Sequence, residues 1–177
     1  PPPPPPPFFS TPTPAPASSL GLVGSEMCIR DSSKACYPLL RKAKNGASIV
    51  NIIANYSWNA APFVGHSGAA KAGVLNLTRT LALEWADDDI RVNAMCPGVV
   101  LTENVKQNLM IDDNTAKIFE DYIPAGGVTT PEKMAQQVLY LCSPAADVIT
   151  GDMLIADGGQ WLVGNAFYQM GKKFLDD

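Results

Sequence analysis

Residues 48–53 read SIVNII, residues 67–86 read SGAAKAGVLNLTRTLALEWA, and residues 90–96 read IRVNAMC. The first and third pieces are apolar runs of strand length, which are typical of strands covered on both faces. The middle piece repeats apolar residues at helical spacing, and the residues expected to face the core are Ala70, Val74, Leu77, Leu81 and Trp85. A strand, a helix and a strand in this order predict a right-handed parallel crossover.

Further elements are predicted around this unit. They are a helix over residues 33–44, a helix around residues 115–122, a helix over residues 132–142 and a strand over residues 153–156. Ala35, Leu39 and Ala43 would share one face of the first helix, and Pro131 would open the third. Because strands alternate with helices, the fold class is α/β with a parallel sheet, in which ligands bind beyond the carboxyl ends of the strands.

The first part of the chain differs from the rest in composition. Residues 1–19 are rich in proline, serine and threonine and cannot bury a core. Residues 22–32, LVGSEMCIRDS, resemble one reading frame of a common sequencing adapter. We therefore expect residues 1–32 to be a non-native or disordered segment and residues 33–177 to form the folded domain.

Composition argues against several classes of function. The formal net charge is −4, so the chain lacks the basic footprint of a nucleic-acid-binding protein. No apolar run approaches the roughly 20 residues of a membrane span. One histidine and four cysteines without ligand spacing indicate no metal site. The apolar neighbours of the cysteines predict buried thiols in a reducing compartment, and hence an intracellular soluble protein.

Two loops should meet at the carboxyl edge of the sheet, one over residues 54–65 and one over residues 97–103. Ser67 and Lys71 are four residues apart at the start of the long helix, so they share a face beside this edge. A lysine there can hydrogen-bond a ribose and lower the pKa of a nearby hydroxyl. The spacing alone is equally compatible with a solvated surface lysine.

The segment from Ser67 to Lys71 resembles the Y-x-x-x-K region of short-chain dehydrogenases/reductases. Other segments agree with that family in order: SIVNI at 48–52, LTRTLALEW at 77–85, IRVN at 90–93, PGVVLT at 97–102, ITG at 149–151 and DGG at 157–159. The resemblance covers nearly everything from Ser33 onward. It implies the C-terminal half of a Rossmann-type, doubly wound parallel sheet. The residues that it implies for binding the carboxamide end of the nicotinamide are Pro97, Gly98, Val100 and Thr102.

Two departures from the family pattern narrow the range of reactions that the resemblance implies. Ser67 stands where the family has its tyrosine, and Ala54 stands where it has its serine. The usual carbonyl chemistry is therefore disfavoured. In 2,4-dienoyl-CoA reductases of mitochondrial type a serine also precedes the lysine by four residues, and a tyrosine lies just past the strand, as Tyr56 does here. HSGAA at 66–70 and LALEWA at 81–86 are similar to peroxisomal trans-2-enoyl-CoA reductases.

This resemblance implies reduction of a conjugated double bond in an enoyl-CoA or dienoyl-CoA with NADPH, with NADP preferred over NAD on the resemblance alone. Tyr56 would donate to the thioester oxygen, Lys71 would orient the nicotinamide ribose, and Ser67 would support this network. The family also implies a homotetramer for the intact protein, and a peroxisomal or mitochondrial location is compatible with it, although no targeting signal is visible.

Two alternatives remain open, a reductase of a small ketone or sugar and a non-catalytic dinucleotide-binding protein. Tyr56 has a structural alternative too, as a loop aromatic residue packed on Trp58. No G-x-x-x-G-x-G loop, which cradles the pyrophosphate in the family, occurs in the sequence. We therefore expect the chain as printed to be inactive, to bind a dinucleotide poorly and to expose a sheet edge.

Overall fold

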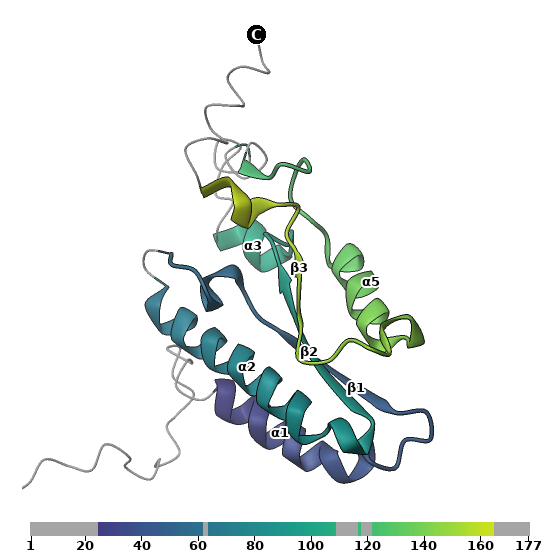
Figure 1. Cartoon of the computed structure of the whole chain (residues 1–177). Helices are drawn as coiled ribbons and strands as arrows, with labels where there is room; N and C mark the ends of the chain where they lie inside the picture. Colours follow the sequence, from purple (N-terminus) through teal and green to yellow (C-terminus); the bar gives the residue numbers. More distant parts are fainter. Residues whose placement is uncertain (1–24, 62–63, 109–116, 118–121, 165–177) are drawn as a thin grey trace, which may run out of the picture.

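The computed structural model describes residues 25–61, 64–108, 117 and 122–164. Within them, three parallel strands form one sheet in chain order, namely β1 (Ala47–Ile52), β2 (Ile90–Pro97) and β3 (Met153–Ala156). Helices α1 (Ser25–Leu40) and α2 (Gly65–Glu84) lie on one side of the sheet, and α5 (Pro131–Cys142) lies on the other (Figure 1). The predicted α/β class with a parallel sheet is confirmed.

The central unit is the pair β1 and β2 with α2 between them. Each of these elements begins and ends within two residues of the predicted bounds. The register places Ile52 opposite Met95, and the backbone N–H of Ile53 donates to the carbonyl of Met95 at 2.9 Å. Strand β2 ends at Pro97, two residues beyond the level of Ile52, so the loops that follow the two strands leave the same edge of the sheet.

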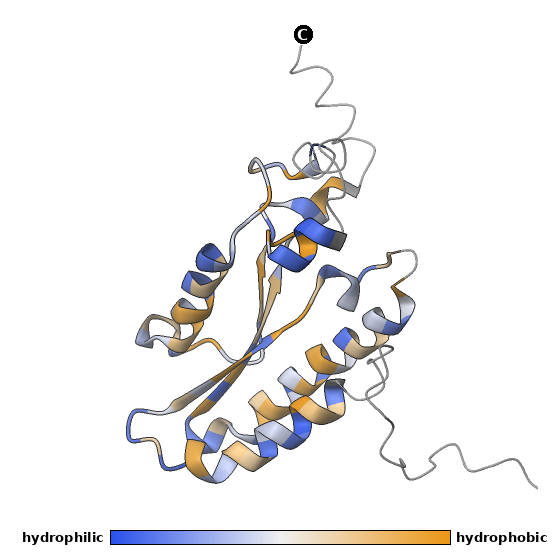
Figure 2. Cartoon of the chain, turned by 180° about the vertical axis from the view of Figure 1, so that it is seen from behind, coloured by the Kyte–Doolittle hydropathy of each residue, from blue (hydrophilic) through white to orange (hydrophobic). Residues whose placement is uncertain are grey.

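The core between α2 and the sheet follows the predicted helical pattern. Among the expected inward residues, Leu77 is half-buried and the others are buried: Ala70, Val74, Leu81 and Trp85. Figure 2 shows apolar residues in the strands and, interrupted by polar ones, along α2. One polar pair also lies inside, because Asn51 Nδ2 donates to Thr78 Oγ1 at 2.9 Å and that hydroxyl donates to the Val74 carbonyl. Burial of these polar groups is thus offset by hydrogen bonds.

Strand β1 differs from the prediction of a strand covered on both faces. Asn51 is its one buried residue, and Ile52 is 42% exposed. Strand β2, which pairs on both sides, buries six of its eight residues. Full burial of a strand requires neighbours along both edges, and among the described residues β1 pairs with β2 alone. Within the described part of the chain, no strand pairs with its other edge.

Helix α1 begins eight residues before the predicted start and ends four residues before the predicted end. The predicted inward face is wrong, because Ala35, Leu39 and Ala43 are all exposed. Tyr37 instead faces inward, stacked on Trp85 at 4.8 Å between ring centroids, and its hydroxyl bonds to Asp88. A large aromatic contact sets the rotation of the helix more strongly than small alanine side chains. That residues 1–32 form a non-native or disordered segment stays a prediction.

The remaining elements are short. Helix α5 begins at Pro131 as predicted, with Thr130 accepting a hydrogen bond from the Lys133 backbone at 3.5 Å. A short helix, α3 (Glu103–Asn108), follows the loop after β2 and was not predicted. The helix expected around residues 115–122 lies largely outside the described residues. Among the described helices, none has the length and apolar character needed to cross a membrane.

The core assignment leads to a prediction about stability. Leu81 is 6% exposed and Leu83 is 83% exposed on the same helix. We expect Leu81→Ala to lower the free energy of unfolding by about 2–5 kcal/mol, because it leaves a cavity under α2. In the monomeric chain, Leu83→Ala should change the free energy of unfolding by less than about 0.5 kcal/mol, because this side chain is exposed. Urea denaturation of both variants checks this, and equal effects would contradict the inward face assigned to α2.

Candidate active site

The loop after β1 folds into a short turn at the carboxyl edge of the sheet. A 3-10 turn, η1 (Asn55–Ser57), begins directly after Ala54. The buried Ser57 hydroxyl donates to the Ala54 carbonyl at 2.6 Å. This contact, which sequence reasoning missed, closes the turn and places Tyr56 just beyond the end of β1.

Ser67 and Tyr56 come together from two different elements. Ser67 lies in the first turn of α2, and its Oγ is 3.4 Å from the Tyr56 hydroxyl. Both side chains are half-buried. The distance is longer than an ordinary O–H···O hydrogen bond, so the contact orients the phenol only weakly. The structure thus brings two of the three predicted catalytic residues into contact.

Lys71 lies one turn further along α2. Its Nζ donates to the Ile52 carbonyl at 2.7 Å, at the last residue of β1. Burial lowers the pKa of the half-buried Lys71 ammonium. The alternative of a fully solvated lysine therefore does not fit. No side-chain pattern could have identified the backbone oxygen that receives this lysine, because its position depends on how α2 packs on β1.

The predicted nicotinamide-binding segment follows β2 directly. The Gly98 N–H donates to the Ala156 carbonyl at 3.2 Å. A Cβ at Gly98 would lie 2.9 Å from the Asp157 Cα, so no side chain fits there. Val100 forms a bridge with Thr129, and the Thr102 hydroxyl accepts from the Val105 backbone at 3.2 Å at the start of α3. The segment that contains Pro97 is thus fixed to β3 and to α3.

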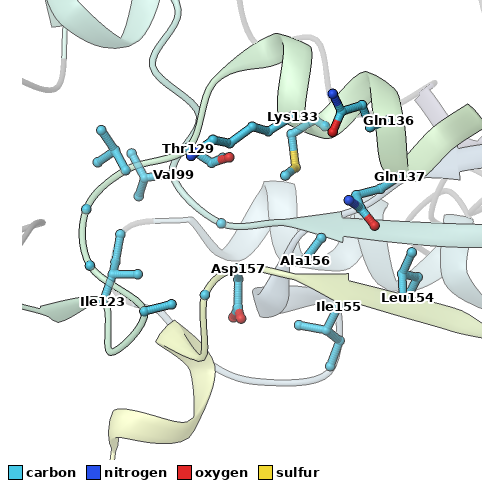
Figure 3. Close-up of a pocket in the computed structure, with 17 residues that line it drawn as sticks. Val99, Ile123, Thr129, Lys133, Gln136, Gln137, Leu154, Ile155, Ala156 and Asp157 are labelled. Atoms are coloured by element: carbon cyan, nitrogen blue, oxygen red, sulfur yellow. The ribbon is translucent and has the colours of Figure 1, made fainter.

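Two cavities lie at this end of the molecule. A cleft of about 350 Å³ runs between the loop after β1 and the start of α2, with Tyr56, Asn59 and Gly68 among its lining residues. A larger cavity of about 490 Å³ lies between α5, β3 and residues 123–129. Figure 3 shows Lys133, Gln136 and Gln137 of α5 on one side of it and Asp157 on the other. It contacts Gly98, but Tyr56, Ser67 and Lys71 do not line it.

The turn after β3 contributes residues that were predicted only as a turn. The buried Asp157 carboxylate accepts from the backbone N–H groups of Gly159 and Trp161, each at 2.9 Å. Trp161 meets Trp58 edge to face, with ring centroids 6.3 Å apart. An aspartate two residues before a backbone donor is a recognised turn pattern and could have suggested the first contact. The second depends on tertiary packing.

The cysteines are the least accurate part of the prediction. Cys96 is buried, and burial, together with the nearby Asp157, raises the pKa of its thiol to about 12. Cys28, Cys36 and Cys142 are exposed, contrary to the expectation of buried thiols. Over the described ranges, no three histidine, cysteine, aspartate or glutamate side chains gather in a way that could hold a metal ion.

The chain is similar in sequence to known reductases and dehydrogenases. Residues 29–160 match a family model described as Enoyl-(Acyl carrier protein) reductase. The chain is 42% identical over 120 residues to the "Probable 2,4-dienoyl-CoA reductase [(2E)-enoyl-CoA-producing]" of Bacillus subtilis (strain 168), which covers 67% of this chain and 47% of that protein. It is 37% identical over 118 residues to 2-dehydro-3-deoxy-D-gluconate 5-dehydrogenase of Escherichia coli (strain K12), covering 67% and 46%.

A solved structure has a related fold and an unusual site. It is the NADPH-bound short chain oxidoreductase from Pseudomonas aeruginosa PAO1 containing an atypical catalytic center. The match has a TM-score of 0.66 and 30% identity, and it covers 72% of this chain and 50% of that one. The chain spans about half the length of the curated relatives that it matches.

Because Lys71 is half-buried, we expect the stability of the chain to depend on pH. Its folded-state pKa lies below the ordinary 10.5, so between these two values the unfolded chain binds more protons than the folded chain. Stability therefore rises with pH across that window. Urea denaturation should show the wild-type chain gaining stability relative to Lys71→Met as the pH rises toward 10.5, with Lys106→Met on exposed α3 as the charge control. Parallel curves for wild type and Lys71→Met would show that the lysine is fully hydrated.

Two glycines offer a matched test of backbone packing. Gly98→Ala would place a Cβ against the Asp157 backbone, and we expect a loss of about 1–3 kcal/mol from this overpacking. Gly65→Ala lies at the start of α2 with nothing within 4 Å of the new Cβ, so it should be neutral or stabilising by up to about 1 kcal/mol. Thermal melting compares them, and an unchanged Tm for Gly98→Ala would refute the close approach to β3.

Proposed function

This chain belongs to the short-chain dehydrogenase/reductase family, and we propose that it contains the reacting half of an NADPH-dependent reductase of conjugated double bonds in acyl-CoA thioesters. The observation that favours this activity is the position of the phenol. Tyr56 approaches from the loop after β1, while the matching position on α2 holds Ser67. The match to a dienoyl-CoA reductase supports the same substrate class.

The position of the donor distinguishes conjugate reduction from carbonyl reduction. In carbonyl reduction, hydride adds to the carbon that is bonded directly to the oxygen receiving a proton. In conjugate reduction, the negative charge develops on a thioester oxygen several bonds from the carbon that takes the hydride. A donor that comes from the loop after β1, and not from α2, is compatible with the second case, and here the Tyr56 hydroxyl lies 3.4 Å from the Ser67 hydroxyl.

The residues at the edge also fit the nicotinamide end of a dinucleotide. Lys71 has three donors, of which one contacts the Ile52 carbonyl at 2.7 Å, so it can also hold ribose hydroxyls. The segment from Pro97 to Thr102 leaves β2 at the same edge and would hold the carboxamide. A reduced nicotinamide bound there would supply the hydride. The NADPH-bound relative supports this choice of cofactor.

The chain's own groups act on the thioester. As the double-bond electrons move toward the thioester carbonyl, Tyr56 donates a hydrogen bond to the oxygen that gains charge. Lys71 contributes positive potential nearby, and Ser67 supports the phenol. A proton from water then adds to carbon, so that one hydride and one proton saturate one double bond. Because the hydrogen bond strengthens only as charge develops, it should act mainly on kcat.

We also propose that the intact protein assembles as a homotetramer. Leu39 on α1 is 73% exposed and Leu83 on α2 is 83% exposed. Exposed leucines on adjacent helices support a packing role for these helices between copies, since large apolar side chains in contact with water favour association. Acyl-CoA is the proposed small-molecule partner.

The activity test uses a chimera, because this chain spans about half of its relatives. In the chimera, the stretch of the Bacillus subtilis reductase that matches this chain is replaced by the corresponding stretch of this chain. We expect NADPH oxidation with a 2,4-dienoyl-CoA or a trans-2-enoyl-CoA, and a roughly 10²–10³-fold lower kcat in Tyr56→Phe, the size of effect seen when an oxyanion donor is removed. Tyr140→Phe, an exposed tyrosine on α5, is the matched control.

Each other outcome would change a different part of this proposal. Turnover of a small ketone or sugar without turnover of thioesters would favour the carbonyl reductase. Cofactor binding without any turnover would favour a non-catalytic dinucleotide-binding protein. Thioester turnover that is equal in wild type and Tyr56→Phe would keep the activity and remove the tyrosine from its mechanism.

A further inference from the structure

The contact between Trp58 and Trp161 joins two segments that lie about a hundred residues apart in the sequence. Their rings meet edge to face, with an interplanar angle of 79°. Figure 1 shows that η1 and the yellow turn η4 (Gln160–Gly164) both lie beyond the carboxyl ends of the strands. We propose that Trp161 is a positioning residue for Tyr56, acting through Trp58. The catalytic part of this proposal rests on the proposed function, whereas the structural coupling does not.

The backbone around Trp161 is fixed by buried groups in its own turn. The carboxylate of Asp157, 6% exposed, accepts from the Trp161 backbone N–H, and Val163 at the other end of η4 is 2% exposed. Asp157 in turn packs against the backbone at Gly98, where no Cβ would fit. The indole of Trp161 therefore projects from a turn that is anchored to both β3 and the end of β2.

The partner, Trp58, is held less firmly by its own turn. It directly follows η1, two positions after Tyr56, and it packs on the core cluster that includes Ile53 and Val74. Its backbone N–H reaches the Asn55 carbonyl at 3.4 Å, which is a long contact. A single 3-10 turn has little stability of its own, so an aromatic contact at its end adds to the Ser57 hydrogen bond in fixing it.

Among the described residues, the Tyr56 hydroxyl has one hydrogen-bond partner, the Ser67 hydroxyl. The 3.4 Å contact with the Ser67 hydroxyl is longer than an ordinary hydrogen bond. The direction of the phenol therefore depends on how well η1 is held, and one side of η1 is held by Trp58 between the core and Trp161. A donor that acts in the transition state must be oriented before the charge develops, so loosening η1 should lower kcat more than it raises KM.

The first measurement is hydrogen–deuterium exchange on the whole chain. In Trp161→Ala the amides of residues 57–59 should exchange about three- to tenfold faster, the factor expected for loss of one aromatic contact. Trp161→Phe should restore most of the protection, since it keeps an aromatic edge. Leu139→Ala, an exposed residue on α5, is the control, and the β2 amides should keep their protection in all three variants.

The second measurement uses the chimera. Trp161→Ala should lower kcat for the thioester by a similar factor with little change in KM, and it should have no further effect when Tyr56→Phe is already present. Unchanged exchange at residues 57–59, or an increase spread equally over β2, would overturn the positioning role. Additive losses of kcat in the double variant would overturn it as well. Local exchange changes in a chimera that turns over no thioester would keep the coupling and reject the proposed function.

Discussion

The parallel pairing of β1 with β2 is the interaction on which the rest of the site depends. Its register carries through to the bond between the Ile53 N–H and the Met95 carbonyl, so both strands end near the same edge of the sheet. Because α2 connects these strands, its first turn returns to the same edge. This pairing of the two strands places three residues from different segments at the same edge of the sheet: Tyr56, Lys71 and Gly98.

Much of this architecture could be predicted from the sequence, because periodicity reports which residues a local element buries. The inward face of α2 is one example. The face of α1 was predicted wrongly, since the stack of Tyr37 on Trp85 joins residues far apart in the chain. The candidate residues Tyr56, Ser67 and Lys71 were found by resemblance, but the Ile52 carbonyl and the contact of Trp161 were not. Both depend on tertiary packing that no local pattern records.

Polar groups in this chain divide by position into two kinds. Under α2, the buried polar pair is neutral: Asn51 donates to the Thr78 hydroxyl, which donates to the Val74 carbonyl. At the sheet edge, Lys71 is half-buried and held by a carbonyl dipole rather than a carboxylate. A lysine held in this way keeps a positive potential that an ion pair would largely cancel. That arrangement suits a site where negative charge develops during the reaction.

The order of the strands in the sheet has a consequence for how the protein is made. β1, β2 and β3 lie side by side in the order in which they occur along the chain. Among the three strands that the structure describes, no later strand inserts between two earlier ones. As the polypeptide leaves the ribosome, each newly synthesised strand can dock on the one before it, and the emerging nascent chain can build its sheet in the direction of translation. The last strand to appear then completes the segment around Asp157 that holds the edge in place.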